Sequence, residues 1–203
     1  GPSSGDITLA DLLATCDGAI DAAEGLLDAA RMAVRGATVV EGRVDARLVD
    51  EHQFAAHGLA WYATYVAALQ QMLGWARRLE ADGKLGELES LLVQAAFGEY
   101  LAQMAGGIAM SQIEVVRPGD LGLDEDALTA FRTDVVSQLI ANGNSAAVRI
   151  RIAELIAHGH FGDARPGDGA RARTLAEETA REIWHGNCYG KQEWLGYKVA
   201  LYR

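Results

Sequence analysis

Apolar side chains recur along much of this chain at alternating steps of three and four residues. One such stretch runs from about Thr8 to Gly36, and a longer one runs from Leu48 to about Ala81. Because the α-helix repeats every 3.6 residues, this spacing gathers the apolar positions on one helical face. The pattern therefore predicts two long amphipathic helices.

A third helix is predicted close behind the second. The short turn Asp82-Gly83-Lys84 separates them, and the new helix runs from about Gly86 to Ala105, where Gly106-Gly107 ends it. A turn this short makes consecutive helices antiparallel neighbours. We therefore expect a long antiparallel helical hairpin at the centre of the fold.

Two shorter helices are predicted beyond the hairpin. Asp124 is a capping residue for one that ends near Asn142-Gly143, and Ser145 can cap another that reaches about residue 158. The β-branched run Thr38-Val39-Val40 predicts only a short extended link, since no period-two run is long enough for a sheet. With one helix near the C-terminus, the fold class is an all-α bundle of five or six helices.

Composition changes divide the chain into four parts. Residues 1–5 are typical of an expression scar, and residues 6–158 carry the helical patterns. Residues 159–169, rich in Gly, Asp and Pro, predict a linker, and residues 170–203 predict a C-terminal helical tail. Aromatic residues are concentrated in that tail near Arg and Lys, so we expect it to pack on the bundle or on a second subunit: Trp184, Tyr189, Trp194, Tyr197 and Tyr202.

Composition and charge narrow the classes of function. The 203 residues are 50% hydrophobic, which is typical of a folded domain, and the formal net charge is −10. Such an acidic chain is repelled by a phosphate backbone, so no nucleic-acid partner is expected. The absence of a long uninterrupted apolar run argues against a membrane span, and two cysteines, Cys16 and Cys188, fit a cytoplasmic protein. Abundant Arg and Ala suggest a GC-rich bacterial genome.

Residues that could carry metal or phosphate chemistry are sparse. A di-metal helical bundle needs two Glu-x-x-His pairs, and only Glu182 with His185 has that spacing. No glycine-rich phosphate loop and no Cys-x-x-Cys pair occurs. No metal site is therefore expected, and Cys16, which lies within an apolar stripe, is expected to be an inert core residue.

The most distinctive polar and aromatic positions gather on the predicted hairpin. His52 lies on the apolar stripe as a core or interface histidine, His57 is one turn from Trp61 and can stack on it, and Glu99 lies on a face of small residues. A buried Glu99 would have to reach an Arg, water or the edge of the bundle. The candidate pocket or interface residues are His52, His57, Trp61, Tyr62, Glu99, Tyr100 and Gln103.

Several longer strings support a family resemblance. The segment from Asp50 to Val66, DEHQFAAHGLAWYATYV, and the strings Phe97-Gly98-Glu99-Tyr100-Leu101, GGIAMSQ at 106–112 and Val116-Arg117-Pro118 are the relevant positions. From about Leu9 to Phe161 the chain resembles the N-terminal helical extension of the methylsuccinyl-CoA dehydrogenase branch of the acyl-CoA dehydrogenase flavoenzymes. In that family the flavin, the acyl-CoA thioester and the catalytic glutamate belong to the body that follows the extension.

The resemblance thus implies no catalytic residue here, and FAD only where a dehydrogenase body or partner is present. The first hypothesis is an accessory, interaction-type helical module that forms a homo-oligomer or binds a protein partner. The alternative is a stand-alone small-molecule-binding protein or oxidoreductase with a pocket inside the bundle. Whether the chain is an enzyme stays open at this point.

Overall fold

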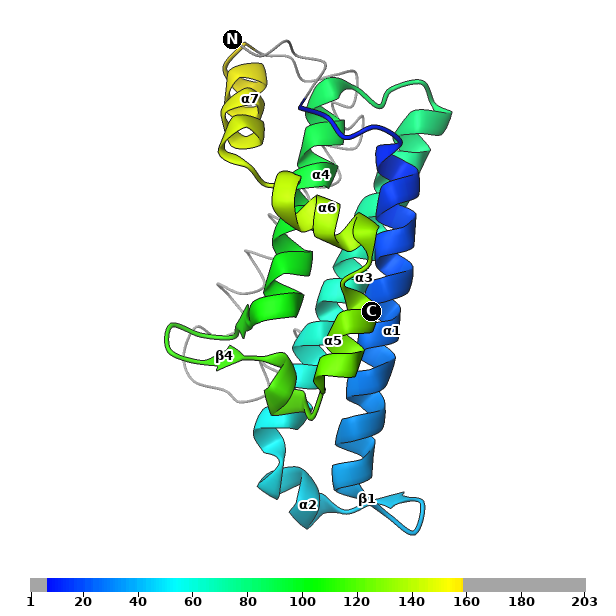
Figure 1. Ribbon diagram of the computed structural model, residues 1–203, viewed down its shortest axis with the longest axis vertical. Coiled ribbons are helices and arrows are strands. Elements are labelled where there is room, and N and C mark those ends of the chain that lie inside the picture. The colour runs from blue at the N-terminus through cyan, green and yellow to red at the C-terminus, as the bar shows by residue number, and fades with distance from the viewer. Residues whose placement is uncertain (1–6, 159–203) are drawn as a thin grey trace, which may run out of the picture. The chain divides into compact units, whose positions relative to one another are not determined.

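The computed structural model describes residues 7–158, and these residues form an all-α bundle, as predicted (Figure 1). Their helices are α1 (Leu12–Thr38), α2 (Ala46–Glu51), α3 (Gln53–Ala81), α4 (Glu87–Gly106), α5 (Glu125–Phe131), α6 (Asp134–Asn142) and α7 (Ala146–Ala157). A 3-10 turn, η2, spans Pro118–Leu121. The chain divides into two units, residues 1–162 and 163–203, and all these elements belong to the first.

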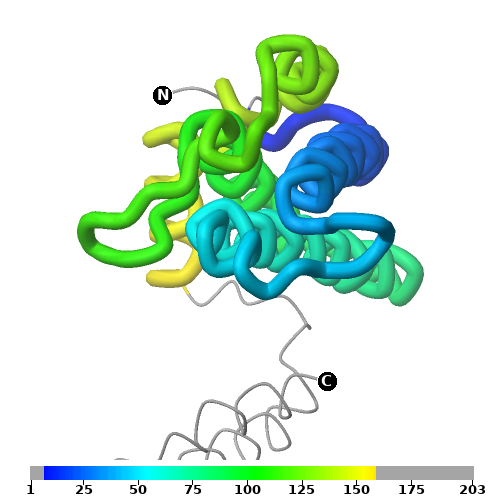
Figure 2. Tube along the Cα trace, turned by 90° about the horizontal axis from the view of Figure 1, so that it is seen from below, coloured from blue at the N-terminus to red at the C-terminus, as the bar shows by residue number. Residues whose placement is uncertain are grey.

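The central hairpin consists of α3 and α4, which run antiparallel on either side of the turn at Gly83. Gly83 has a φ of 66°, a left-handed conformation that favours glycine. The buried hydroxyl of Tyr62 on α3 donates to the carbonyl of Met104 on α4 at 2.7 Å and so ties the two helices together. α1 also packs along α3, and Figure 2 shows α1 and α3 nearly end-on beside one another.

The described residues contain seven α-helices, more than the five or six expected for the whole chain. The predicted second helix is interrupted at His52, which has φ −105° and ψ 26° and joins α2 to α3. The predicted Asp124 helix is likewise divided, because Thr133 caps the new helix α6 by accepting from the backbone N–H of Val136. Apolar periodicity continues across both breaks, so it could not reveal them.

Two short strand pairs replace segments for which no sheet was expected. β1 (Val39–Val40) pairs antiparallel with β2 (Arg43–Val44), and β3 (Ile108–Ala109) pairs with β4 (Val115–Val116). Each strand has only two residues, too few for hydrophobic alternation to be recognised. The predicted extended link is therefore one strand of a hairpin whose turn places Gly42 at φ 78°.

Most of the core lies where α1, α3 and α4 meet. Its largest fully buried side chains include Phe97, Leu69 and Leu101. α5 and α6 close this core from one side, as their buried Phe131 and Leu139 show.

A second, smaller cluster holds α7 against the first half of α4. It comprises Leu88 and Leu91 of α4 with Val148 and Leu155 of α7. Beside it, the Arg151 guanidinium donates to both carboxylate oxygens of Glu87 at 2.7 and 2.8 Å. This bidentate pairing raises the pKa of Arg151 and fixes the direction of α7.

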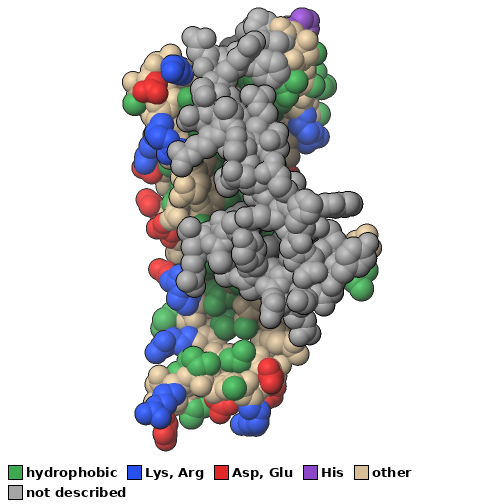
Figure 3. All heavy atoms as spheres, turned by 180° about the vertical axis from the view of Figure 1, so that it is seen from behind, with side chains coloured by type: hydrophobic (Ala, Val, Ile, Leu, Met, Phe, Trp, Pro, Cys, Tyr) green, Lys and Arg blue, Asp and Glu red, His purple; other side chains and the backbone are tan. Residues whose placement is uncertain are grey.

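Apolar side chains are also exposed at the β1–β2 end of the bundle, where Figure 3 shows them among charged groups. They belong to α1, the β1–β2 strand pair and α3: Met32, Val40, Val44 and Phe54. The predicted linker, the aromatic tail, Cys188 and the Glu182–His185 pair lie outside the described residues.

Candidate functional site

Six side chains form a continuous surface patch along the central hairpin, which we call the aromatic–polar patch. His57, Trp61 and Tyr65 project from α3 at intervals of four residues and therefore lie on one face of the helix. Glu99, Tyr100 and Gln103 come from α4. His57 and Glu99 are exposed, and the other four are partly buried.

The aromatic side of the patch is a ladder of ring contacts. Trp61 donates its indole N–H to Nε2 of His57 at 3.2 Å. Its ring meets the edge of Tyr65 at a centroid distance of 6.5 Å and an interplanar angle of 72°. Tyr65 then stacks on Tyr100 at 4.4 Å, which joins α3 to α4. Each such pair contributes about 0.5–1.5 kcal/mol beyond the area it buries.

The polar side of the patch begins at the same tyrosine. The Tyr65 hydroxyl donates to Oε1 of Gln103 at 2.5 Å, and the Gln103 amide donates to Oε1 of Glu99 at 2.7 Å. Nδ2 of Asn144, which lies between α6 and α7, donates to Oε2 of Glu99 at 2.9 Å. The Tyr65 hydroxyl and the side-chain amides of Gln103 and Asn144 thus each donate to an acceptor, and these hydrogen bonds hold the polar side of the patch in place.

These contacts shift the pKa values of two titratable groups of the patch, Glu99 and Tyr65, in opposite directions. The amide donors of Gln103 and Asn144 lower the pKa of Glu99, with a smaller contribution from the charge of Arg149. Burial, Tyr100 and the negative charge of Glu99 raise the pKa of Tyr65. Glu99 is therefore ionised at neutral pH, and Tyr65 keeps the proton that it donates to Gln103.

A close contact between α4 and the end of α6 places Asn144 beside Glu99. A Cβ atom added at Gly98 would lie 2.9 Å from both the Gly143 Cα and the Asn144 nitrogen. A Cβ added at Gly143 would lie 2.4 Å from the Leu139 carbonyl oxygen and 2.7 Å from that of Gln94. Glycine is required at both positions for steric reasons, because the two backbones touch.

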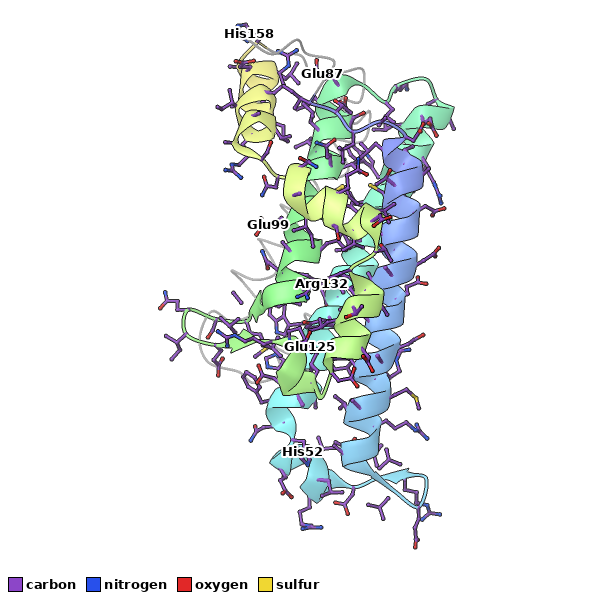
Figure 4. The ribbon with its side chains drawn as sticks, in the orientation of Figure 1. His52, Glu87, Glu99, Glu125, Arg132 and His158 are labelled. Carbon is purple, nitrogen blue, oxygen red and sulfur yellow. The ribbon has the colours of Figure 1, made fainter. Side chains whose placement is uncertain are left out.

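The structure separates two of the seven candidate residues from the other five. Tyr62 is fully buried, and burial, together with the charge of Asp120, raises its pKa. His52 lies at the α2–α3 junction, whereas Glu99 lies about halfway along α4 (Figure 4). His57, Trp61, Glu99, Tyr100 and Gln103 are the five that come together.

Two members of the network were missed by the sequence analysis. Tyr65 was detectable, because it follows Trp61 by one helical turn. Asn144 was not, because only the Gly98–Gly143 contact brings it to α4. Tertiary contacts of this kind have no local sequence signal.

Of the outcomes expected for Glu99, the structure shows the exposed edge of the bundle, where the carboxylate accepts from the side-chain amides of Gln103 and Asn144. The nearly buried glutamate of α4 is Glu89, 5% exposed, whose Oε2 has no hydrogen-bond partner in the structure. Its carboxylate turns back over Gly86 at the N-terminus of α4, where the helix dipole favours negative charge.

The described residues place aromatic rings and hydrogen-bonding side chains at the surface of the central hairpin. Within residues 7–158, no three side chains from His, Cys, Asp and Glu are grouped as metal ligands would be. None of the helices in that range is both long and apolar enough to span a membrane. Trp and Tyr in a partly buried cluster with a polar edge are typical of residues that anchor protein–protein interfaces.

The architecture and the patch thus define a small all-α helical module with an ordered aromatic surface. No protein-family model matches the chain. Over 157 residues it is 43% identical to a (2S)-methylsuccinyl-CoA dehydrogenase of Cereibacter sphaeroides. The match covers 77% of this chain but only 28% of that protein, so the chain is similar to a segment of an acyl-CoA dehydrogenase and spans less than a third of its length.

Proposed function

We propose that this chain is an accessory helical module that binds the catalytic body of an acyl-CoA dehydrogenase through its aromatic–polar patch. The observation that carries the proposal is the extent of the similarity, 77% of this chain against 28% of the relative. That relative, which is named for a catalytic activity, is more than three times as long as the matched segment. A segment that builds its own core and presents an ordered aromatic surface is suited to docking.

Two properties of the patch support a docking role. Its polar groups are already paired in the free protein, so binding does not have to order them, and this lowers the entropic cost of association. Its aromatic side chains remain partly exposed and have few rotatable bonds, so they can bury area at a small loss of side-chain entropy. A cytoplasmic location would accompany this role.

The direct test combines this chain with the C. sphaeroides dehydrogenase from which the matched segment has been deleted, in a preparation that retains its flavin. We expect a complex of defined mass in light scattering. Replacing Trp61 by Ala should weaken the dissociation constant by at least tenfold, because central aromatic side chains contribute most to interface affinity. Thr64→Ala is the matched control, since Thr64 is exposed on α3 and bonds only to the Ala60 carbonyl of its own helix.

The absence of a complex at concentrations of about 100 μM, where even weak specific complexes form, would contradict the proposal. The alternative function is a stand-alone small-molecule-binding protein or oxidoreductase. Binding of flavin or acyl-CoA by the chain alone, seen as absorbance or as a raised melting temperature, would favour that alternative.

A further inference from the structure

α3 carries a buried inner apolar face and, beside it, a second apolar stripe whose larger side chains touch the core but remain partly exposed. The inner face is buried, with Tyr62, Val66 and Leu69 at 3% exposure or less. The outer face consists of side chains spaced by four, three, four and three residues, all only partly buried: Trp61, Tyr65, Ala68, Met72 and Trp75. A second apolar stripe at helical spacing indicates a further packing contact.

α4 extends this surface sideways. Leu92 is 38% exposed, Ala96 is partly buried, and Tyr100 stacks on Tyr65 across the hairpin. We call these three residues, together with the five of α3, the α3–α4 outer face. The stretch from Trp61 to Trp75 is about 21 Å long at 1.5 Å per residue, which matches four turns of a docked helix.

The middle of the outer face is formed by small residues. The Tyr65–Tyr100 stack fixes the antiparallel register, which places Ala68 of α3 level with Ala96 and Phe97 of α4. Trp61, Tyr65 and Tyr100 lie toward one end of the outer face, on one side of these alanines. Met72 and Trp75 lie toward the other end. Small side chains between bulky ones allow the backbone of another helix to approach to the usual 8–10 Å.

Charge argues against a second copy of this chain as the occupant. The formal net charge is −10, so the long-range electrostatic interaction between two copies is repulsive on average. None of the eight outer-face residues is charged. The face therefore fits an apolar helix stripe on a partner that is less acidic than this chain.

The comparison points to the source of that partner helix. In the C. sphaeroides relative the matched segment belongs to a chain whose remaining part is more than twice as long as the match. We propose that the α3–α4 outer face binds one amphipathic helix of an acyl-CoA dehydrogenase-type catalytic body. This inference rests on the proposed function. The aromatic–polar patch then forms one end of this contact, and Met72 and Trp75 form the other.

Ala68→Arg against Ala67→Arg is the decisive pair of variants. Ala68 lies in the middle of the outer face, whereas its neighbour Ala67 is exposed and points elsewhere on α3, and both substitutions change the net charge equally. The probe is the flavin-loaded C. sphaeroides dehydrogenase without its matched segment, titrated with the full chain. We expect Ala68→Arg to raise the dissociation constant at least tenfold and Ala67→Arg to change it less than twofold.

Leu92→Arg is a second variant on the α4 side, with the same expected loss of affinity, in case Ala68→Arg fails to fold. Circular dichroism checks that the variants compared remain helical. Wild-type affinity in a folded Ala68→Arg or Leu92→Arg chain would overturn this inference but leave the proposed function standing. Loss of all binding in the wild-type chain would instead contradict the proposed function itself.

Two further results would assign the face to another occupant and overturn the inference. One is a dimer of the chain alone that Ala68→Arg dissociates, which would identify a second copy. The other is a fall in melting temperature caused by Ala68→Arg in the full chain but not in a chain ending at Gly162. That result would identify residues 163–203.

Discussion

The two sides of α4 hold their neighbours in different ways. On the side that meets α6, Gly98 and Gly143 bring two backbones into contact, and Gln94 is completely buried. On the side that meets α3, Tyr100 and Gln103 make side-chain contacts that remain partly open to solvent, and the exposed Glu99 continues this network to Asn144. The first side admits no added atom, whereas the second has room for substitution.

This difference separates stability from recognition within one helix. A backbone contact cannot relax around an extra methyl group, because the atoms that would clash belong to the main chain. A half-exposed side-chain network can lose a member and be partly replaced by water. We therefore expect substitutions on the α6 side to affect folding most and those on the α3 side to affect binding most.

The largest effect is expected for Gly143→Ala. The new Cβ would lie 2.7 Å from the Gln94 carbonyl oxygen and 2.9 Å from the Gly98 Cα, both on α4, so α4 and α6 would have to separate, and it would also crowd the Leu139 carbonyl oxygen of α6 itself at 2.4 Å. We expect the free energy of unfolding to fall by about 3 kcal/mol. Urea denaturation followed by circular dichroism measures this change.

Gly25→Ala is the control for that substitution, because a Cβ there meets nothing within 4 Å. Gly25 lies within α1, where alanine is the better helix former, so stability should rise by about 0.5–1 kcal/mol. Equal effects of the two substitutions would show that the α4–α6 contact is not close.

Gln94→Ala should have the next largest effect. The Gln94 side chain accepts from the Leu9 N–H at 2.7 Å and donates to the Ile7 carbonyl at 3.0 Å, so it anchors the segment before α1. Truncation leaves both groups without this partner and opens a cavity, at a cost of about 2 kcal/mol. The exposed Gln71 supplies the control, since Gln71→Ala should change the unfolding free energy by less than about 0.5 kcal/mol.

Cys16 gives a pH-dependent test of the core. Burial raises the pKa of its thiol from 9.0 to about 12, and the nearby Asp17 adds to this shift. The unfolded chain releases the proton first, so stability is complete below pH 9 and falls as the pH rises toward 12. The free energy of unfolding should fall by on the order of 1 kcal/mol per pH unit in this range.

Measuring the free energy of unfolding at a series of pH values from 8 to 11 tests this prediction. In the Cys16→Ala variant, the part of the pH dependence that comes from the thiol should disappear. Thiol labelling of a Cys188→Ser chain provides a second measurement. Cys16 is fully buried, so it should react only when the protein unfolds. Rapid labelling of the folded chain would show that the α1 core opens readily.

The smallest effect on stability is expected on the α3 side, for Glu99→Gln. Hydrogen bonds from Gln103 and Asn144 lower the pKa of Glu99, so its contribution is present above the unfolded pKa and is lost as the pH falls through the folded value. Because the carboxylate is exposed, solvent screening limits the loss to a few tenths of a kcal/mol. Unfolding measured at pH 7 and then at successively lower pH should show the difference between wild type and variant in full at pH 7 and a steady decrease in that difference below pH 4.5.

Much of the candidate patch could be predicted from residue types and spacing. His57 and Trp61 are one turn apart, and an antiparallel hairpin necessarily brings Tyr100 and Gln103 of one helix near the middle of the other. Which of these residues would be buried could not be predicted. The helical period defines a face only to within a residue, and Tyr62 and Tyr65 differ by about 60° around α3. That angle places one in the core and the other on the surface.

The all-α class, the central hairpin and the capping residues Asp124 and Ser145 could all be read from residue order. They depend on the helical period and on side chains that bond to a backbone N–H three residues away. The contact of Gly98 with Gly143, the hydrogen bond of Asn144 to Glu99, and the burial of Glu89 rather than Glu99 emerge only in the folded molecule. They depend on how closely α4, α6 and the start of the chain approach one another, and that distance is set by packing among segments remote in sequence.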